Sequence, residues 1–307
     1  MSEATRDVVG YGQYPPRVTW PDGAHVAVNI VVNYEEGSEY SFAMGDEESE
    51  KAGGESATNF PPGVRDLAME SMYEYGSRTG VWRLFRLFEE YDLNVTMFGC
   101  AVAFELNPAV AVAAREAGHD LLSHGWRWEE HWRLTREEER ERIRRAVSSF
   151  EHTWGERPEG WYCRYGPSVN TRDLVVEEGG FIYDSDAYND DLPYFKEVRG
   201  RQHLVIPYSL TYNDWNVQRN PYDYADFLKR GFDELWLEGE RGYPKMMSVG
   251  LHPRIVGQAG RVSALREFIE HALGKGNVWF ARRLDIANWW LQHHAEFPQA
   301  QPELSEA

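Results

Sequence analysis

Two adjacent carboxylates stand at the end of an apolar run near the start of the chain. Residues 25–32 are rich in valine and isoleucine, and Glu35, Glu36 and a glycine follow within five residues. A short run of β-branched residues bounded by turn residues is typical of a buried strand. Acids at the end of such a strand would stand at a sheet edge, where α/β proteins place their chemistry. The alternative is a solvated acidic turn.

Further polar residues follow the ends of other predicted strands. These are His124, Arg164, the pair Asp184 and Asp186, and His252. In β/α barrels the strand ends converge on one face, where catalytic residues lie. Each residue alone has a structural explanation, such as a buried histidine, a turn or an ion pair. Their shared position at strand ends favours one site.

The chemistry that these residue types indicate is hydrolysis. A carboxylate can accept a proton from water, and a histidine can protonate a leaving group. Arg164 or backbone N–H groups could hold a developing oxyanion. A glycosidase is the competing reading, but adjacent residues on a strand point in opposite directions and would not flank a bond from two sides.

The elements that must position these residues alternate along the chain. Such alternation predicts an α/β fold, most simply one distorted (β/α) barrel of about seven parallel strands. Thr135 and Glu138 form a capping box, and Ser77 could cap an earlier helix. Strands are expected at about 25–34, 95–102, 119–123, 160–163, 181–183, 203–209, 245–251 and 278–281. Helices are expected at about 77–88, 108–118, 135–150, 223–237, 261–273 and 285–294, and a further helix should reach Gly179 and Gly180.

No linker divides the chain, so a single catalytic domain is predicted over residues 25–295. An irregular arm, 1–24, should precede it and a frayed tail, 296–307, should follow it. The barrel carries a long insertion at 37–62, rich in Gly, Ser and Glu. A connection of this length is typical of a lid, a subunit contact or disorder.

Composition excludes several classes of function. The chain has 307 residues and a formal net charge of −18, which argues against nucleic acid or an anionic membrane surface as partner. No apolar run is long enough to span a membrane, and the start has no secretory signal pattern. The two cysteines, Cys100 and Cys163, are expected to be buried free thiols in the cytoplasm. A catalytic Cys163 is the less favoured reading.

Several stretches resemble the polysaccharide deacetylase family over about residues 7–295. They are Asn33-Tyr34-Glu35-Glu36-Gly37, Ser123-His124-Gly125-Trp126-Arg127-Trp128 and Gly250-Leu251-His252. The pattern is similar to the metal-independent allantoinase branch, which also shares residues 69–78 and 183–194. The resemblance implies a distorted barrel in which Glu35 is the general base and His252 the acid. It also implies a cytoplasmic enzyme of purine catabolism that forms a tetramer.

The same resemblance indicates that a metal site has been lost. Trp128 stands where the family has its second metal-binding histidine, which leaves too few donors for three protein ligands and a water. His131 is a possible substitute ligand, whereas His119 should lie at the far end of its strand. We therefore expect no metal and no other cofactor.

The predicted substrate is a small cyclic ureide or imide, most simply allantoin, whose ring nitrogen is a delocalised leaving group. Substrate-binding roles are expected for Glu36, His124, Trp128, Arg164, Tyr165, Asp184 and Asp186. Residues 162–172 depart from the allantoinase pattern by one residue, so the substrate stays open. The alternatives are a hydrolase of other small cyclic amides or imides, and a deacetylase-like protein, active on N-acetyl sugars or inactive.

Overall fold

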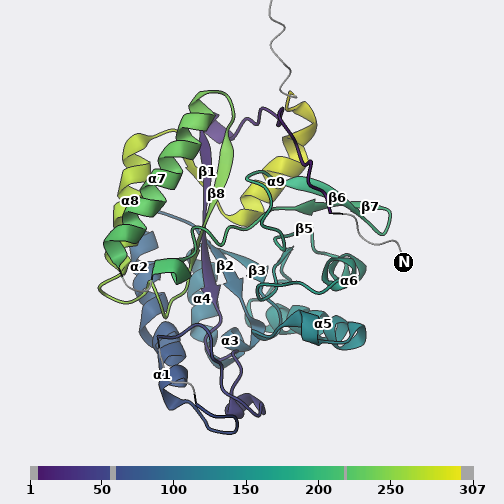
Figure 1. Ribbon diagram of the computed structural model, residues 1–307, viewed down its shortest axis with the longest axis vertical. Helices are drawn as coiled ribbons and strands as arrows, with labels where there is room; N and C mark the ends of the chain where they lie inside the picture. Colours follow the sequence, from purple (N-terminus) through teal and green to yellow (C-terminus); the bar gives the residue numbers. More distant parts are fainter. Residues whose placement is uncertain (1–5, 56–59, 218–219, 299–307) are drawn as a thin grey trace, which may run out of the picture.

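A curled, mostly parallel β-sheet forms the centre of the molecule (Figure 1). The computed structural model describes residues 6–55, 60–217 and 220–298. Within these residues nine strands pair in the order β6-β7-β5-β4-β3-β2-β1-β8, and β9 also pairs with β1. Their bounds are β1 Val26–Tyr34, β2 Thr96–Gly99, β3 Asp120–Ser123, β4 Gly160–Trp161, β5 Tyr183–Asp184, β6 Tyr194–Val198, β7 Arg201–Val205, β8 Lys245–Leu251 and β9 Val278–Phe280.

The sheet is an open barrel. The described pairs are parallel except β6 with β7, which is antiparallel. The end strands β6 and β8 do not pair with each other in the described chain, so the curled sheet stays open. This confirms the predicted distorted (β/α) barrel. The carboxyl ends of the parallel strands point to one end of the barrel, where a site is expected.

Strand β1 shows how the sequence sorts side chains between two buried layers. Val28, Ile30 and Val32 pack between the sheet and the helices, whereas Ala27 and Val31 face the barrel interior. All nine residues of β1 are buried, as expected for a central strand covered on both faces. Because side chains alternate along a strand, the polar residues two and four positions after Val31 also lie on the interior side.

Helices cover the outer face of the sheet (Figure 1). Helix α5 begins at the predicted capping box, in which Thr135 accepts from the Glu138 N–H and Glu138 from the Thr135 N–H. That prediction is confirmed. The helices are α1 Leu67–Tyr75, α2 Val81–Glu90, α3 Ala101–Leu106, α4 Pro108–Glu116, α5 Arg136–Thr153, α6 Thr171–Glu178, α7 Pro221–Glu240, α8 Val262–Lys275 and α9 Arg283–His293.

The prediction that Ser77 begins a helix is wrong. A π-helical turn, Gly76–Gly80, joins α1 to α2 without a break, and the Ser77 hydroxyl instead bonds the Tyr34 hydroxyl at 2.8 Å. The glycines explain this turn. A Cβ on Gly76 would lie 2.3 Å from Glu36 Oε1, and one on Gly80 would lie 2.0 Å from the Pro253 carbonyl oxygen. The turn therefore brings backbone close to the loops that carry the polar residues.

Two strand predictions also need correction. The strand expected at 95–102 ends at Gly99, because the apolar run continues into the buried helix α3, and hydrophobicity alone does not separate these cases. Strand β6 was not predicted. Its side chains are mostly half-exposed or exposed, and it joins β7 through Arg199 and Gly200, both with positive φ, as in a tight hairpin turn.

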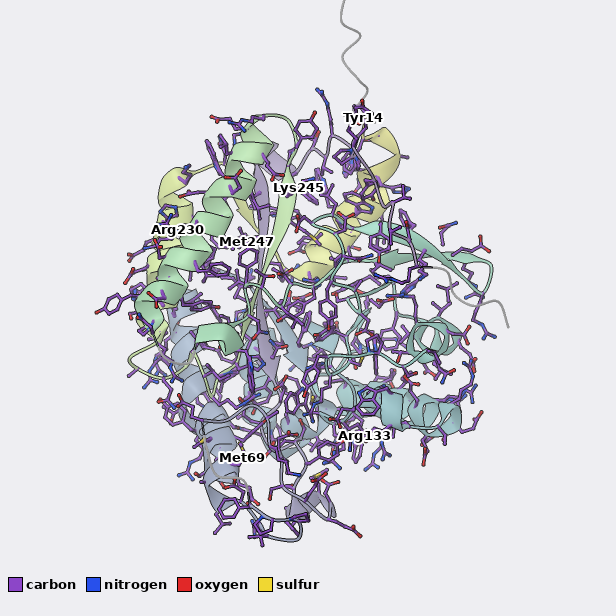
Figure 2. The ribbon with its side chains drawn as sticks, viewed as in Figure 1. Tyr14, Met69, Arg133, Arg230, Lys245 and Met247 are labelled. Carbon is purple, nitrogen blue, oxygen red and sulfur yellow. The ribbon has the colours of Figure 1, made fainter. Side chains whose placement is uncertain are left out.

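The predicted N-terminal arm and the predicted insertion lie at opposite ends of the barrel. The arm packs at the amino ends of the strands, where Trp20 donates to the Lys245 carbonyl oxygen; Figure 2 shows Lys245 and Tyr14 at this end and Met69 of α1 at the other. The described part of the insertion, 37–55 and 60–62, lies at the Met69 end (Figure 1). Residues 1–5 of the arm, 56–59 of the insertion and 299–307 of the tail lie outside the described residues.

Candidate active site

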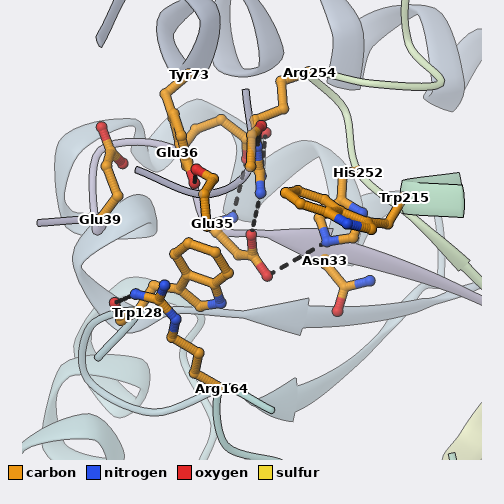
Figure 3. A network of polar contacts seen from close by, with 12 residues as sticks. Asn33, Glu35, Glu36, Glu39, Tyr73, Trp128, Arg164, Trp215, His252 and Arg254 are labelled. Carbon is orange, nitrogen blue, oxygen red and sulfur yellow. Dashed lines mark hydrogen bonds and ion pairs between the residues drawn. The ribbon is translucent and has the colours of Figure 1, made fainter. Parts of the chain in front are cut away.

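The Glu35 carboxylate is the centre of a buried polar cluster at the carboxyl end of β1 (Figure 3). Its Oε1 lies 3.1 Å from His124 Nε2 and 3.7 Å from His252 Nε2. Its Oε2 accepts a hydrogen bond from the Arg254 guanidinium at 2.7 Å. His124 follows β3, and His252 and Arg254 follow β8. The sequence therefore correctly placed Glu35, His124 and His252 at strand ends that converge.

Glu36 follows Glu35 just beyond the end of β1 and points away from this centre, toward Gly76. Its Oε2 accepts from the backbone N–H of Glu35 at 3.0 Å, and its Oε1 lies 3.5 Å from the Arg254 guanidinium. The side chain packs against the bare Cα of Gly76. Glu36 is buried and contacts both the Glu35 backbone and the Arg254 guanidinium, so it helps to hold them in place.

Arg254 is fixed between the two acids. Its Nε donates to the Gly53 carbonyl oxygen at 2.8 Å, so the insertion 37–62 holds the guanidinium from one side. Its guanidinium carbon lies 4.2 Å from the centre of the Tyr73 ring of α1. Arg254 is 4% exposed, so its charge lies in a low-dielectric environment, where electrostatic interactions are stronger than in water. Sequence reasoning had assigned this residue no role.

The cluster shifts the pKa values of Glu35 and Glu36 in opposite directions. Burial by itself would raise the pKa of Glu35, but Arg254, then His252 and His124, outweigh burial and hold that pKa below its ordinary value. Burial raises the pKa of Glu36 to about 7; Arg254 opposes this rise, and the charge of Glu35 adds to it. Glu35 is therefore a carboxylate at neutral pH. Glu36 contacts the same arginine but is the weaker acid.

The His124 ring is held between two acceptors. Nδ1 lies 2.9 Å from the Tyr162 carbonyl oxygen, and Nε2 faces the Glu35 carboxylate. Both neighbours can only accept hydrogen bonds, so both contacts are satisfied when each ring nitrogen carries a proton. The ring also stacks on Tyr162, with 5.1 Å between ring centres. His124 is therefore held in a fixed position beside the Glu35 carboxylate.

His252 is oriented by Asp214, a residue that sequence reasoning did not single out. Nδ1 lies 2.6 Å from Asp214 Oδ1, and the His252 backbone N–H donates to Asp214 Oδ2 at 2.7 Å. Val256 donates its N–H to the same Oδ2. With Nδ1 occupied in this way, Nε2 is the nitrogen that faces Glu35. A histidine held by a carboxylate can carry a proton at Nε2 and release it.

A cavity of about 400 Å³ opens beside these groups. Its size suits a small molecule. Five of the predicted site residues line it: Glu35, His124, Trp128, Tyr165 and His252. Tyr162, in the segment 162–172 that was expected to line the pocket, also lines it, whereas sequence reasoning missed Asn33, Ala52, Tyr208, Leu210, Asn213 and Trp215. Asn33 could have been found, since it lies two residues before Glu35 on the same face of β1.

Arg164 does not line the cavity. Its guanidinium pairs with the Glu50 carboxylate at 2.7 Å and 3.1 Å and stacks on the Trp128 ring at 3.6 Å. It also donates to the Tyr165 hydroxyl. Arg164 thus fastens the insertion, which carries Glu50, over the wall formed by Trp128 and Tyr165. An oxyanion-binding role for Arg164 would require this ion pair to open.

Asp184 and Asp186 lie beside the site in a separate network and do not line the cavity. Asp184 pairs with Arg172 at 2.6 Å and with His203 at 3.0 Å. Asp186 accepts from the backbone N–H and the thiol of Cys163. Burial raises the pKa of the Cys163 thiol well above its ordinary value, so the thiol is not activated as a nucleophile.

Comparisons with known proteins identify the family. A family profile described as Polysaccharide deacetylase matches residues 65–182. A Schizosaccharomyces pombe protein named "Putative polysaccharide deacetylase" is 36% identical over 318 residues, which cover 94% of this chain and 98% of that protein. The chain belongs to the polysaccharide deacetylase family. Its barrel is therefore the fold of a family of hydrolases.

Two solved structures of this family are similar over nearly the whole chain. "Puue Allantoinase" is 46% identical with a TM-score of 0.91, covering 95% of this chain and 99% of that one. A "probable Polysaccharide deacetylase" from Pseudomonas aeruginosa PAO1 is 45% identical with a TM-score of 0.90, covering 94% and 98%. The resemblance to the family and to its allantoinase branch is confirmed. The names of these two proteins differ in the reaction that they describe.

The metal site that the polysaccharide deacetylase family implies does not fit the residues present here. Glu36 is engaged by Arg254, both nitrogens of His124 are engaged, and the Trp128 indole has no lone pair for a metal. His131, the possible substitute, bonds Glu139 at 3.2 Å. Within residues 6–55, 60–217 and 220–298, no group of three or more His, Cys, Asp or Glu is arranged to hold a metal ion.

One further expectation concerns membranes. Among the described helices, none is long and apolar enough to cross a bilayer.

Proposed function

We propose that this protein hydrolyses the ring of a small cyclic amide without a metal, and that allantoin is its substrate. The observation that carries the proposal is the pair formed by the Glu35 carboxylate and His252 Nε2, 3.7 Å apart on the wall of a cavity of about 400 Å³. The likeness to PuuE allantoinase supports the choice of substrate.

In this mechanism Glu35 accepts a proton from a water molecule that attacks a ring carbonyl carbon. His252 is held through Nδ1 by Asp214 and donates its own Nε2 proton to the departing ring nitrogen. The carbon–nitrogen bond breaks and the ring opens to a carboxylate and a free ureide or amide. Arg254 and His124 hold Glu35 in position and in its ionised form.

The low pKa of Glu35 favours an activated substrate. Arg254 and the neighbouring histidines hold the pKa of Glu35 below its ordinary value, so Glu35 is ionised at neutral pH but is a weak base. A weak base is best matched to an activated amide. In a cyclic ureide the departing nitrogen is delocalised over a neighbouring carbonyl group, so it leaves more readily than an amine does. An N-acetyl sugar lacks this activation and would benefit from the charge of a metal ion.

A panel of substrates tests the proposal. Allantoin, hydantoin, succinimide and N-acetylglucosamine oligomers are offered to the purified enzyme, with Glu35→Gln as the control for contaminating activity. We expect ring opening of allantoin at the highest kcat/KM, unchanged after treatment with a chelator. Highest activity on succinimide would point to the second candidate, a cyclic imide hydrolase. Release of acetate from the sugar oligomers alone would refute the proposal.

A further inference from the structure

Two side-chain amides converge on the hydroxyl group of Tyr208 in the floor of the cavity. Asn33 Nδ2 lies 3.3 Å from Tyr208 Oη, and Asn213 Nδ2 lies 3.1 Å from it. The neighbours of each amide fix its orientation. Asn33 Nδ2 also donates to the Leu251 carbonyl oxygen, and Asn213 Oδ1 accepts from the backbone N–H of Trp215. A flipped amide would put oxygen against oxygen or N–H against N–H.

Both lone pairs of the Tyr208 hydroxyl are therefore occupied, since a phenolic oxygen accepts at two positions and donates at one. Its proton must point in the remaining direction. No described residue accepts it, and Tyr208 lines the cavity. The arrangement depends on Gly250, where a Cβ would lie 1.9 Å from Tyr208 Oη. Tyr208 is thus a hydrogen-bond donor prepared for a ligand.

Asn33 supplies the complementary group. Its Nδ2 is occupied twice, by Tyr208 and by Leu251, whereas its Oδ1 has no partner among the described residues. Asn33 lines the cavity, and this oxygen is not one of the fully enclosed unpartnered atoms, so a ligand can reach it. The cavity floor therefore presents one donor, Tyr208 O–H, beside one acceptor, Asn33 Oδ1.

We propose that Asn33 and Tyr208 recognise the edge of a cyclic amide, with Tyr208 donating to a ring carbonyl oxygen and Asn33 accepting from the neighbouring ring N–H. This inference rests on the proposed function and specifies how that site selects its substrate. A small ring forces its amide to be cis, so N–H and C=O lie side by side on one edge. An acyclic amide, as in an N-acetyl sugar, is trans, and its N–H and C=O point in opposite directions.

Glu35 and His252 act on one amide of the ring, so Asn33 and Tyr208 would bind the other amide, which is not broken. Hydantoin and 1-methylhydantoin separate these roles, since methylation removes the N–H of that second amide and leaves the reacting bond unchanged. We expect kcat/KM of the unaltered enzyme to be at least about 10-fold lower for the methylated ring. Asn33→Leu, which removes the acceptor oxygen, should bring the two substrates within about 3-fold.

Tyr208→Phe should raise KM for both rings by about 10-fold and change kcat less. The matched control is Tyr224→Phe, a buried tyrosine outside the cavity whose hydroxyl donates to the Tyr212 carbonyl oxygen, and its KM should not change. Binding of both rings to Glu35→Gln by calorimetry, with and without Asn33→Leu, gives the same comparison without turnover.

The outcomes separate this inference from the proposed function. Ring opening by the unaltered enzyme with equal kcat/KM for both rings, or a preference that survives Asn33→Leu, overturns the edge recognition and leaves the proposed function standing. No ring opening, but tighter binding of hydantoin than of its methylated form to Glu35→Gln, supports the edge recognition and refutes the proposed function. Neither turnover nor binding of any cyclic amide refutes both.

Discussion

Replacing Glu36 by glutamine should remove a loss of stability that the wild-type protein suffers as pH rises. Burial raises the pKa of Glu36 from 4.5 to about 7, so the folded state binds its proton more tightly than the unfolded state does. The benefit of that proton is fully present below about pH 4.5 and disappears as pH rises through about 7. The shift of ~2.5 units corresponds to about 3 kcal/mol at ~1.4 kcal/mol per unit.

Urea unfolding at pH 5 and at pH 8 measures this effect. Glutamine resembles the protonated acid and keeps an oxygen for the Glu35 N–H, so Glu36→Gln should gain up to about 3 kcal/mol over wild type between the two pH values. Glu39 and Asp186, whose pKa values burial also raises to about 7, titrate in both proteins and cancel in the difference. The exposed Glu74→Gln serves as the charge control. A stability difference that is the same at both pH values would refute this account.

Four further changes test the roles assigned to the cluster. Glu35→Gln should lower kcat by at least about 10²-fold while circular dichroism shows an intact fold; normal turnover of this variant together with an inactive Glu36→Gln would exchange the two roles. His252→Asn should lower kcat to a similar extent, and retained activity would remove His252 as the acid. Asp214→Asn should lower kcat by about 10²-fold or more with little effect on KM, because the histidine loses its orienting carboxylate. Trp128→Phe should raise KM more than it lowers kcat; an unchanged KM would show that Trp128 does not contact the substrate.

Much of the fold could be predicted because apolar periodicity is a local property. The β1 run, the capping box at Thr135 and the strand before His252 were all found from spacing and residue type. The errors came where local pattern has two solutions. The apolar residues after Gly99 suit a strand or a buried helix equally, and β6 lacks apolar alternation because it lies at the edge of the sheet.

The partners of the site residues could not be predicted in the same way. Glu50 pairs with Arg164, and Asp214 with His252, through loops that have no periodic pattern. The pairing of Arg254 with Glu35 joins residues 219 positions apart in the chain. Local sequence fixes the face on which a side chain lies, but an ion pair depends on which distant segments meet.

The sequence by itself determined which chemistry is possible here. Residue type and strand alternation placed Glu35 and His252 at strand ends, and the resemblance to the polysaccharide deacetylase family indicated that Trp128 stands at a metal-ligand position. The tertiary structure alone decided how those residues behave. It set Arg254 between two acids, which separates their pKa values, and directed two amides onto one hydroxyl so that its proton must face the cavity. Charge and hydrogen-bond direction depend on distances between groups, and only the folded chain sets those distances.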